Sequence, residues 1–314
     1  MSVLSSRYFH CEEAAFEHLE SIVWANGVTC PHCGSISAKH YDLRKTRLGL
    51  RKCSDCRKQF TVKVGTVFES AHIPLNKMLQ AVYLMCASKK GTSAHQLHRV
   101  LGITYKSAWF LCHRIREAMR SGQLAPMGGA GGTVEVDETF IGHDKTIKPK
   151  GEKKGRGYAH KHKVLALVDR ESGQVRFMVV DSLSAKALTP ILKENIDREA
   201  RVMTDEAGQY HHLSKHFEGG HGFTRHGQGQ YVDMQDRTIH TNTIEGYFSI
   251  FKRGMKGTYQ HCAKHHLHRY LAEFDFRYNN RSALGVEDVE RSVNAIEGIV
   301  GKRLQYRSAC AWSQ

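Results

Sequence analysis

The stretch TVEVDETFI, residues 133–141, sets the architecture that we expect for this chain. It is short and rich in β-branched residues, and it carries Asp137 in its middle, where a carboxylate is costly unless it is paired or binds a metal. Further short β runs follow at residues 163–169, 174–181 and 201–205. A helical pattern at 184–198 separates the last two of these runs. Three strands, a helix, a strand and more helix predict an α/β core rather than an all-β one.

Several acids stand at the ends of these strands, and the expected topology separates them. If the fourth strand pairs beside the first, Asp205 lies roughly 5 Å from Asp137, whereas Asp181, at the end of the third strand, lies about 10 Å away. Asp169 closes its strand at a hairpin, where aspartate is a normal turn residue. Asp137 and Asp205 are therefore the better pair for a shared cation. Glu135, on the same strand face as Asp137, remains a rival.

A third acid lies in the block HTNTIEGYFSIFKR, residues 240–253. Helical spacing puts Asn242, Glu245 and Lys252 along one side of a helix. Asn242 followed three residues later by Glu245 also fits a capping box, which is a purely structural interpretation. Glu245 can serve both purposes only if its carboxylate points away from the backbone amides.

Two cysteine pairs stand near the N-terminus, at Cys30-Pro31-His32-Cys33 and Cys53-Ser54-Asp55-Cys56, with 19 residues between them. The C-x2-C spacing predicts a structural zinc ribbon, because two thiolates on one tight knuckle occupy adjacent corners of a tetrahedron. A short segment builds little core by itself, so the metal supplies folding energy. His32 lies inside the knuckle and is expected to be a bystander. Redox-active or accidental pairing of the cysteines is the alternative.

A helical region follows the cysteine pairs. Apolar spacing predicts helices at residues 75–85, 92–101 and 104–120, with a break at Gly102-Ile103 between the last two. A short helix, a glycine turn and a longer helix that carries Lys106 and Arg114 resembles a DNA-binding helix-turn-helix. An ordinary pair of antiparallel helices fits the same pattern.

These patterns give an expected domain order along the chain. The segments are a zinc ribbon at 1–65, a helix-turn-helix-like module at 66–126, a Gly-rich linker at 127–132, a catalytic core at 133–290 and a C-terminal tail at 291–314 without an assigned role.

The charge balance points to a polyanionic partner. Lys plus Arg number 46 against 31 Asp plus Glu, a net charge of +15. A basic, Gly-containing stretch at 143–163 includes Lys153 and Lys154 and suits a phosphate-contacting arm, although a solvated loop has the same composition. No apolar run reaches the ~20 residues that span a bilayer. Nine cysteines without a secretion signal indicate a reducing compartment, the cytoplasm.

The stretch 134–142, the strand end Thr204-Asp205 and the block 240–259 together resemble bacterial insertion-sequence transposases. The most similar group is the insertion sequence 1595 family, with its ISXO-type transposase domain. Residues 267–281 look like the C-terminal helix of that group's transposase domain, and the zinc ribbon and the helical hairpin match its N-terminal region. The resemblance covers roughly Phe16 to Arg281.

The resemblance implies an α/β, RNase H-like mixed-sheet core with a DDE-type metal site. Carried over by position, Asp137 is the first acid, Asp205 the second and Glu245 the third, and Lys252 matches the family's accompanying lysine. Some members have asparagine at the third position, so Asn242 remains a rival, although the seven-residue step to Lys252 favours Glu245. Two Mg²⁺ or Mn²⁺ ions are the expected catalytic cofactors, and zinc the structural one.

The expected reaction is cleavage at transposon ends followed by joining of the 3′-OH to target DNA. Lys252 and Arg253 are expected to contact phosphate, while the zinc ribbon and helical module grip the terminal repeats. Joining two ends requires at least two protomers, which predicts a homo-oligomer on nucleoid DNA. Two alternatives stay open: a non-catalytic zinc-ribbon DNA-binding regulator, and an RNase H-like nuclease that cuts without joining.

Overall fold

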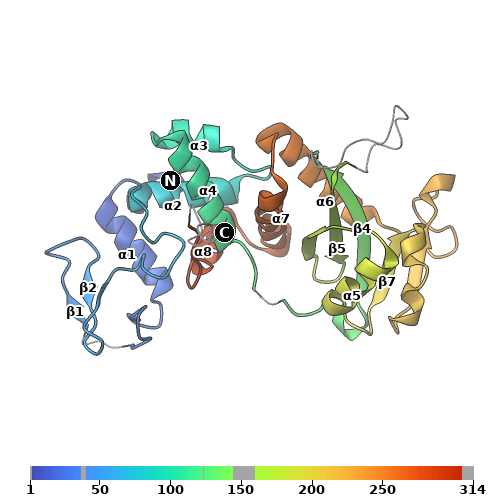
Figure 1. The fold of residues 1–314 in the computed structure, drawn as a ribbon, viewed down its shortest axis with the longest axis horizontal. Helices are drawn as coiled ribbons and strands as arrows, with labels where there is room; N and C mark the ends of the chain where they lie inside the picture. The colour runs from blue at the N-terminus through green and yellow to red at the C-terminus, as the bar shows by residue number, and fades with distance from the viewer. Residues whose placement is uncertain (1, 37–39, 123, 144–159, 306–314) are drawn as a thin grey trace, which may run out of the picture. The chain divides into compact units, whose positions relative to one another are not determined.

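The computed structural model describes residues 2–36, 40–122, 124–143 and 160–305 (Figure 1). The chain divides into two compact units, Met1–Arg120 with Asn280–Gln314, and Ser121–Asn279. Residues after Asn279 are thus grouped with the N-terminal unit, whereas the sequence pattern extends the core to residue 290 and sets 291–314 apart as a tail. No helix in the described ranges is both long and apolar enough to cross a membrane.

In its described residues, the first unit combines five α-helices with a small sheet. The helices are α1 (Glu12–Val23), α2 (Leu75–Ala87), α3 (Ala94–Leu101), α4 (Tyr105–Ala118) and α8 (Asp288–Glu297). The strands β1 (Tyr41–Asp42), β2 (Arg51–Lys52) and β3 (Gln59–Phe60) pair antiparallel in the order β1-β2-β3. Helix α8 packs against α1, α2 and α4, which explains why the chain after the core belongs to this unit.

The pair α3 and α4 has well-formed helix ends. Ser93 caps α3 by accepting a hydrogen bond from the Gln96 amide at 3.1 Å, and Thr104 caps α4 by accepting from the Ser107 amide at 3.2 Å. Gly102 ends α3 with φ 59° and ψ 42°, a left-handed conformation that suits glycine. The predicted helix, glycine turn and helix are therefore present.

Arg114 has a different place from the one expected for a DNA contact. It lies inside the first unit, 8% exposed, and its Nη1 donates to the Glu69 carbonyl at 2.9 Å. The guanidinium is thus engaged within the protein rather than offered to a ligand, which corrects the expectation. Lys106 on the same helix is exposed and remains a candidate for contacting DNA.

The second unit is built on a mixed five-stranded sheet in the order β6-β5-β4-β7-β8. Its strands are β4 (Thr133–Ile141), β5 (His162–Asp169), β6 (Val175–Val180), β7 (Arg201–Asp205) and β8 (His221–Thr224). The β4-β5 and β5-β6 pairs are antiparallel, and the β4-β7 and β7-β8 pairs are parallel. The fourth strand therefore lies beside the first, as predicted. The short strand β8 was not predicted from the sequence.

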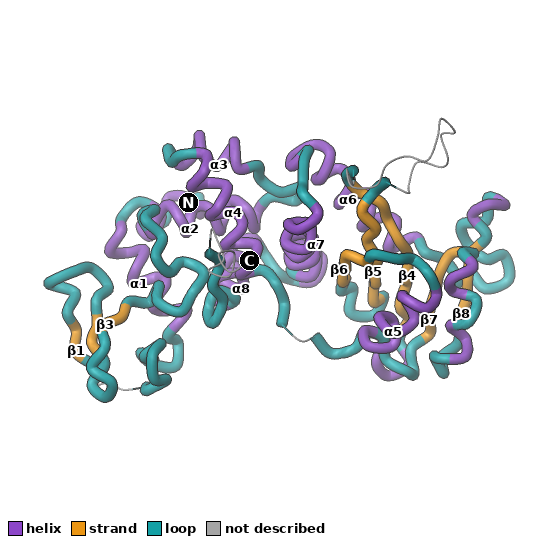
Figure 2. Tube along the Cα trace, in the orientation of Figure 1, coloured by secondary structure: helices purple, strands orange, loops and turns teal. Residues whose placement is uncertain are grey.

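Helices cover both faces of this sheet (Figure 2). Helices α6 (Asn242–Gly254) and α7 (Lys264–Asn279) share one hydrophobic core with Ile141 of β4, and α5 (Ala185–Asn195) shares the other with Val134 and Val136. Because side chains alternate along a strand, Glu135 and Asp137 project to the α6 side. This alternation positions the acids of β4 beneath the helix that carries Glu245.

A buried carboxyl on α7 joins that helix to α6 and the sheet. Asp275 accepts hydrogen bonds from the Tyr247 hydroxyl at 2.8 Å and from the Phe177 amide at 2.9 Å. Burial raises the pKa of Asp275 to about 7.

Asp275 is expected to make the stability of the protein fall as the pH rises from about 4 to about 7. In this window the unfolded chain has already released the proton of this carboxyl, whose ordinary pKa is about 3.9, while the folded protein still holds it, so folding becomes less favourable. Urea unfolding at pH 5.5 and 7.5 measures the slope. Asp275→Asn should show a smaller fall than the wild type over this interval, and an equal fall in both proteins would contradict the assignment.

Candidate active site and zinc cluster

The first two acids stand level on neighbouring strands. Glu135 of β4 is in register with Met203 of β7, the last pair of this ladder, and Asp137 and Asp205 each lie two residues further along their strands. Adjacent strands are about 4.8 Å apart, so the predicted pairing of these acids is consistent with the register. Local amides orient both groups: Asp137 Oδ1 accepts from the Glu138 amide at 2.7 Å, and Asp205 Oδ1 from the Ala207 amide at 3.0 Å.

The two other strand-end acids have structural partners. Asp169 Oδ1 accepts from the Glu171 and Ser172 amides at 3.0 and 3.1 Å, which is the turn role expected of it. Asp181 is exposed and forms an ion pair with Lys264 at 3.0 Å. Neither belongs with the pair formed by the first two acids.

Glu245 lies in the first turn of α6. The helix begins at Asn242, and its N-cap, Thr241, makes no side-chain capping hydrogen bond, so the capping box is absent. The Glu245 side chain is 42% exposed, and its Oε1 lies 3.7 Å from His226 Nδ1. Its carboxylate therefore does not cap the start of α6 and remains available for a ligand.

Burial raises the pKa of Asp137 well above its ordinary value, and the charges of Glu138, Asp205 and Glu245 raise it further. Among the described residues no Lys or Arg forms an ion pair with Asp137 or Asp205. Hard carboxylate oxygens without a protein cation suit Mg²⁺ or Mn²⁺. In the described ranges, the four cysteines are the one group of three or more Cys, His, Asp or Glu side chains placed to hold a single metal ion, and Asp137, Asp205 and Glu245 do not form such a group.

Glu135, the rival acid, holds the start of α6. It is fully buried, and its Oε2 accepts from the Ile244 amide at 2.9 Å. Its Oε1 accepts from Thr243 Oγ1 at 2.8 Å and from Arg170 Nε at 2.7 Å. Both oxygens are thus used to cap the helix that presents Glu245, which makes Glu135 a positioning residue rather than a metal ligand.

Glu135→Ala is expected to lower the free energy of unfolding by about 3–5 kcal/mol, because it leaves the Arg170 guanidinium without its buried counter-charge and α6 without a cap. Urea unfolding at pH 7 measures the loss. The exposed ion pair of Arg198 and Glu218, 2.8 Å apart, gives the control, since Glu218→Ala should cost less than about 1 kcal/mol. Equal losses in the two variants would refute the capping role.

Two residues of the site were not singled out from the sequence. Glu138 is held by Gln209, whose Nε2 donates to Glu138 Oε1 at 3.0 Å, and burial raises the pKa of Glu138. His226 lies 3.0 Å from Thr224 Oγ1 through its Nε2 and faces Glu245 through its Nδ1. Strand alternation separates Glu138 from Asp137, and His226 begins a 3-10 turn of only three residues, so neither carries a periodic signal.

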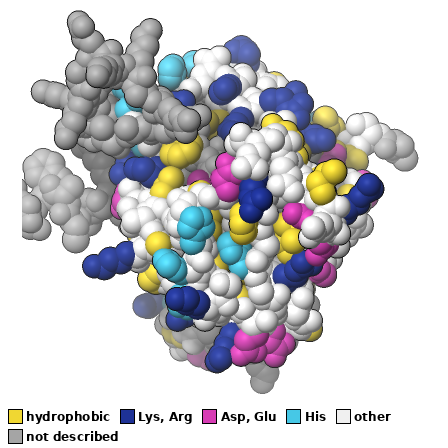
Figure 3. Space-filling model, turned by 90° about the vertical axis from the view of Figure 1, so that its right-hand side faces the viewer, with side chains coloured by type: hydrophobic (Ala, Val, Ile, Leu, Met, Phe, Trp, Pro, Cys, Tyr) yellow, Lys and Arg dark blue, Asp and Glu magenta, His cyan; other side chains and the backbone are white. Residues whose placement is uncertain are grey.

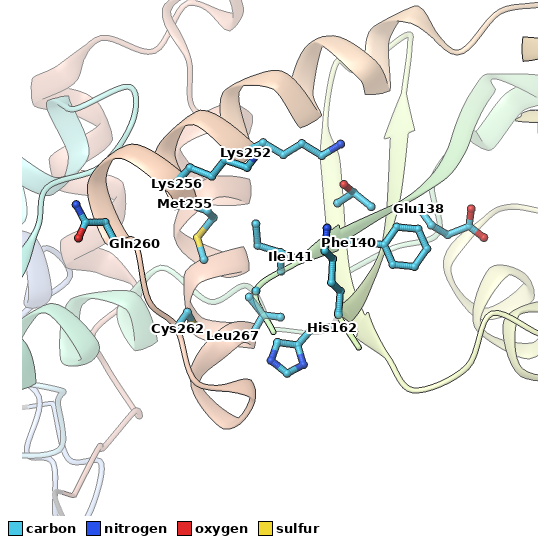
Figure 4. A pocket seen from close by; sticks show the side chains of 13 residues that line it. Glu138, Phe140, Ile141, His162, Lys252, Met255, Lys256, Gln260, Cys262 and Leu267 are labelled. Carbon is cyan, nitrogen blue, oxygen red and sulfur yellow. The ribbon is translucent and has the colours of Figure 1, made fainter. Parts of the chain in front are cut away.

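The basic residues of α6 lie in its last turn. Lys252 is exposed, its Nζ 5.5 Å from the Phe248 ring centroid, and in Figure 4 it extends from the helix toward β4. Arg253 is exposed and donates to Ser249 Oγ at 2.8 Å. Lys153 and Lys154 lie outside the described residues.

The four cysteines of the two knuckles converge. All four sulfur atoms lie within 4.8 Å of one another, with Cys30 3.7 Å from Cys56 and Cys33 3.7 Å from Cys53. Four sulfurs around zinc at about 2.3 Å are separated by about 3.8 Å, so this cluster fits a tetrahedral zinc site. His32 is a bystander, as expected, because its Nε2 lies 3.2 Å from the Gln59 carbonyl.

Comparison with known proteins matches both parts of the chain. The model of the ISXO2-like transposase domain matches residues 129–279, and that of the transposase zinc-ribbon domain matches residues 10–59. The chain is 28% identical over 279 residues to the uncharacterized protein in transposable element ISH50 of the archaeon Halobacterium salinarum, covering 86% of this chain and 91% of the relative.

Among solved structures, a chain of the simian T-cell lymphotropic virus intasome in complex with PP2A regulatory subunit B56 gamma aligns with a TM-score of 0.28 and 12% identity. The alignment covers 63% of this chain and 65% of that chain, slightly less than two thirds of its length. The matched sequence domains, in the order zinc ribbon then transposase domain, decide the assignment: the chain belongs to the insertion sequence 1595 family of transposases.

Proposed function

We propose that this protein cuts DNA at the ends of an insertion sequence and joins the freed 3′-OH to target DNA. The observation that carries the proposal is the level placement of Asp137 and Asp205 on adjacent strands, with the charge of Glu245 acting on Asp137. Membership of a transposase family supports the substrate class.

Asp137, Asp205 and Glu245 are the residues that hold two Mg²⁺ or Mn²⁺ ions in this proposal. When bound, such ions stabilise the attacking and leaving oxygens of an in-line displacement at phosphorus. Glu135 and Arg170 keep α6 in place, so that Glu245 faces the two strand acids. Lys252 and Arg253, exposed on the last turn of the same helix, contact the phosphates that flank the scissile bond.

The same site serves two successive displacements. In the first, water attacks the phosphodiester at the transposon end, and the 3′ oxygen leaves as a free hydroxyl. In the second, that hydroxyl attacks a target phosphodiester, one P–O bond forms as another breaks, and the target's own 3′ oxygen leaves. Both steps are phosphoryl transfers that need charge neutralisation and alignment rather than a protein nucleophile.

The remaining parts of the protein bind DNA. Zinc held by Cys30, Cys33, Cys53 and Cys56 folds the ribbon, and the ribbon and the α3-α4 pair with Lys106 grip the terminal repeats. Figure 3 shows Lys, Arg and His side chains spread over one face of the second unit and interspersed with Asp and Glu, and the basic ones among them are available to DNA phosphates. Two ends must be joined together, so we include a homo-oligomer, acting on the nucleoid in the cytoplasm, in the proposal.

The test combines the purified protein with Mg²⁺, labelled transposon-end DNA and a supercoiled plasmid. Products in which the labelled end is joined to the plasmid support the proposal. Cleavage without joining identifies an RNase H-like nuclease, and tight end binding without either product identifies a regulator. Each of those two results would overturn the proposed joining activity.

The third acid is tested within the same assay. Glu245→Gln is expected to lower joining by about 10²-fold or more, because the variant loses a charged oxygen ligand without losing volume. Asn242→Ala alters the exposed first residue of the same helix and should change joining only a few-fold. If Asn242→Ala abolishes joining and Glu245→Gln does not, the role of third ligand passes to Asn242.

A further inference from the structure

A cavity of about 570 Å³ opens beside the acids, between the end of β4, the start of β5 and the C-terminal part of α6 (Figure 4). Glu138 lines it and also interacts electrostatically with Asp137, so the cavity adjoins the proposed active site. The proposed chemistry uses Lys252 from its lining but does not fill the space itself. Its volume lies in the range of pockets that take one small organic molecule.

The floor of the cavity contains a buried hydroxyl. Thr139 is 1% exposed, and its Oγ1 has no hydrogen-bond partner among the described residues. It stands two residues beyond Asp137 on the same strand face. A buried polar atom without a partner is unfavourable, so this hydroxyl is available to hydrogen-bond with the polar edge of a ligand.

The backbone along the cavity is also irregular. Helix α6 continues into a π-helical turn, Met255–Tyr259, which ends at Gln260 with φ 58° and ψ −54°. Both Met255 and Gln260 line the cavity. A π turn and a non-glycine residue at positive φ are conformations that persist mainly at functional sites.

The lining combines two kinds of chemistry. Lys252 and Lys256, one helical turn apart and both exposed, stand at the mouth, while Ile141, Met255 and Leu267 form apolar walls. Figure 4 shows the two lysines on the helix and Ile141 and Leu267 below it in this view. Cations at the mouth and an apolar interior with a single buried hydroxyl match a phosphate joined to a flat heterocyclic base.

We propose that this cavity receives one unstacked nucleotide of the bound DNA, next to the phosphodiester held by the acids. Lys252 and Lys256 bind its phosphate, the apolar walls receive its base, and Thr139 Oγ1 hydrogen-bonds to the base edge. Extrusion of a base frees the neighbouring phosphodiester from the duplex stack, and these contacts offset the lost stacking and pairing. The inference rests on the proposed function for the identity of its DNA.

A cavity-filling variant tests the inference through its substrate dependence. Cys262 lines the cavity and is partly exposed, so Cys262→Trp should fill it, and Cys11→Trp adds the same bulk at a partly exposed cysteine in the other unit. Cys262→Trp is expected to slow cleavage of duplex ends at least about tenfold. Its cleavage rate should recover on DNA in which one nucleotide near the cleavage site is abasic, because no base then has to enter the cavity. Cys11→Trp should cleave every substrate like the wild type. Absence of recovery at all abasic positions would overturn the inference, provided that both variants melt like the wild type.

The buried hydroxyl gives a second, independent variant. Thr139→Val keeps the shape of the side chain but removes the hydrogen bond to the base edge. We expect cleavage to fall about tenfold, which is the equivalent of one hydrogen bond. Thr139→Ser keeps the hydroxyl and should cleave at the wild-type rate. Both should bind DNA equally, so the effect appears in rate and not in affinity. Equal rates for the two variants would overturn the role of this hydroxyl.

Fluorescence without added Mg²⁺ separates this inference from the proposed function. DNA ends carrying 2-aminopurine at successive positions should change emission at one position with wild-type protein and not with Cys262→Trp. This readout shows whether a base enters the cavity even if the wild type never joins DNA. Failure to join DNA would refute only the proposed function. Emission that stays unchanged at every position with the wild-type protein would overturn the inference, and binding of free nucleoside monophosphates to that protein would then identify a free-nucleotide site.

Discussion

Asp137→Asn is expected to lower end cleavage and joining by about 10³-fold while it raises the melting temperature of the protein measured without Mg²⁺. The two effects have one cause. Burial and three neighbouring carboxylates raise the pKa of Asp137, so its charged form is held at a cost that the neutral amide avoids. A residue with only a structural role would lose activity and stability together.

Asp181→Asn is the matched control. Asp181 directly follows strand β6 of the same sheet, but it is exposed and paired with Lys264. Its replacement should change neither joining nor the melting temperature by a measurable amount. Mg²⁺ should raise the melting temperature of the wild type and of Asp181→Asn more than that of Asp137→Asn. Wild-type activity in Asp137→Asn would remove Asp137 from the site.

Much of the core follows from local pattern, because strands and helices with one buried face show it in their residue spacing. Strand β4 has the bounds predicted for it, and β7 lies beside it as the pairing of Asp137 with Asp205 requires. The strand β8, HGFT, is short and offers neither an apolar run nor a clear alternation. It became a strand only because β7 leaves an edge for it to pair with.

The distinction between Glu135 and Asp137 depends on contacts that the sequence does not contain. Both acids occupy one strand face, and only the tertiary structure brings Arg170 and Ile244, 35 and 109 residues away, onto Glu135. Arg114 shows the same limit, since helical spacing shows where a residue projects but not which carbonyl it meets. Local periodicity thus finds the elements and the candidate acids, and long-range packing assigns their roles.

The zinc cluster follows from spacing alone, and its removal is expected to have the largest effect on folding. Among the described residues, only three of the hydrophobic cluster around it are buried, namely Cys30, Cys53 and Phe60, and two of them are the proposed ligands. A core of that size supplies little of the folding energy, whereas structural zinc in small domains is worth about 10–16 kcal/mol at pH 7.

Cys53→Ser, or treatment of the wild type with a chelator, should therefore unfold the ribbon around β1, β2 and β3. Limited proteolysis followed by mass spectrometry should show new cleavage between Cys30 and Phe60, with the sheet of the second unit still protected. Metal analysis should find one zinc per wild-type chain. Cys262→Ser changes a partly exposed cysteine outside the cluster and should keep both the zinc and the proteolytic pattern. A wild-type protein that is purified without chelator and contains no zinc would contradict the metal site, because the four converging sulfurs would then have to hold the ribbon without it.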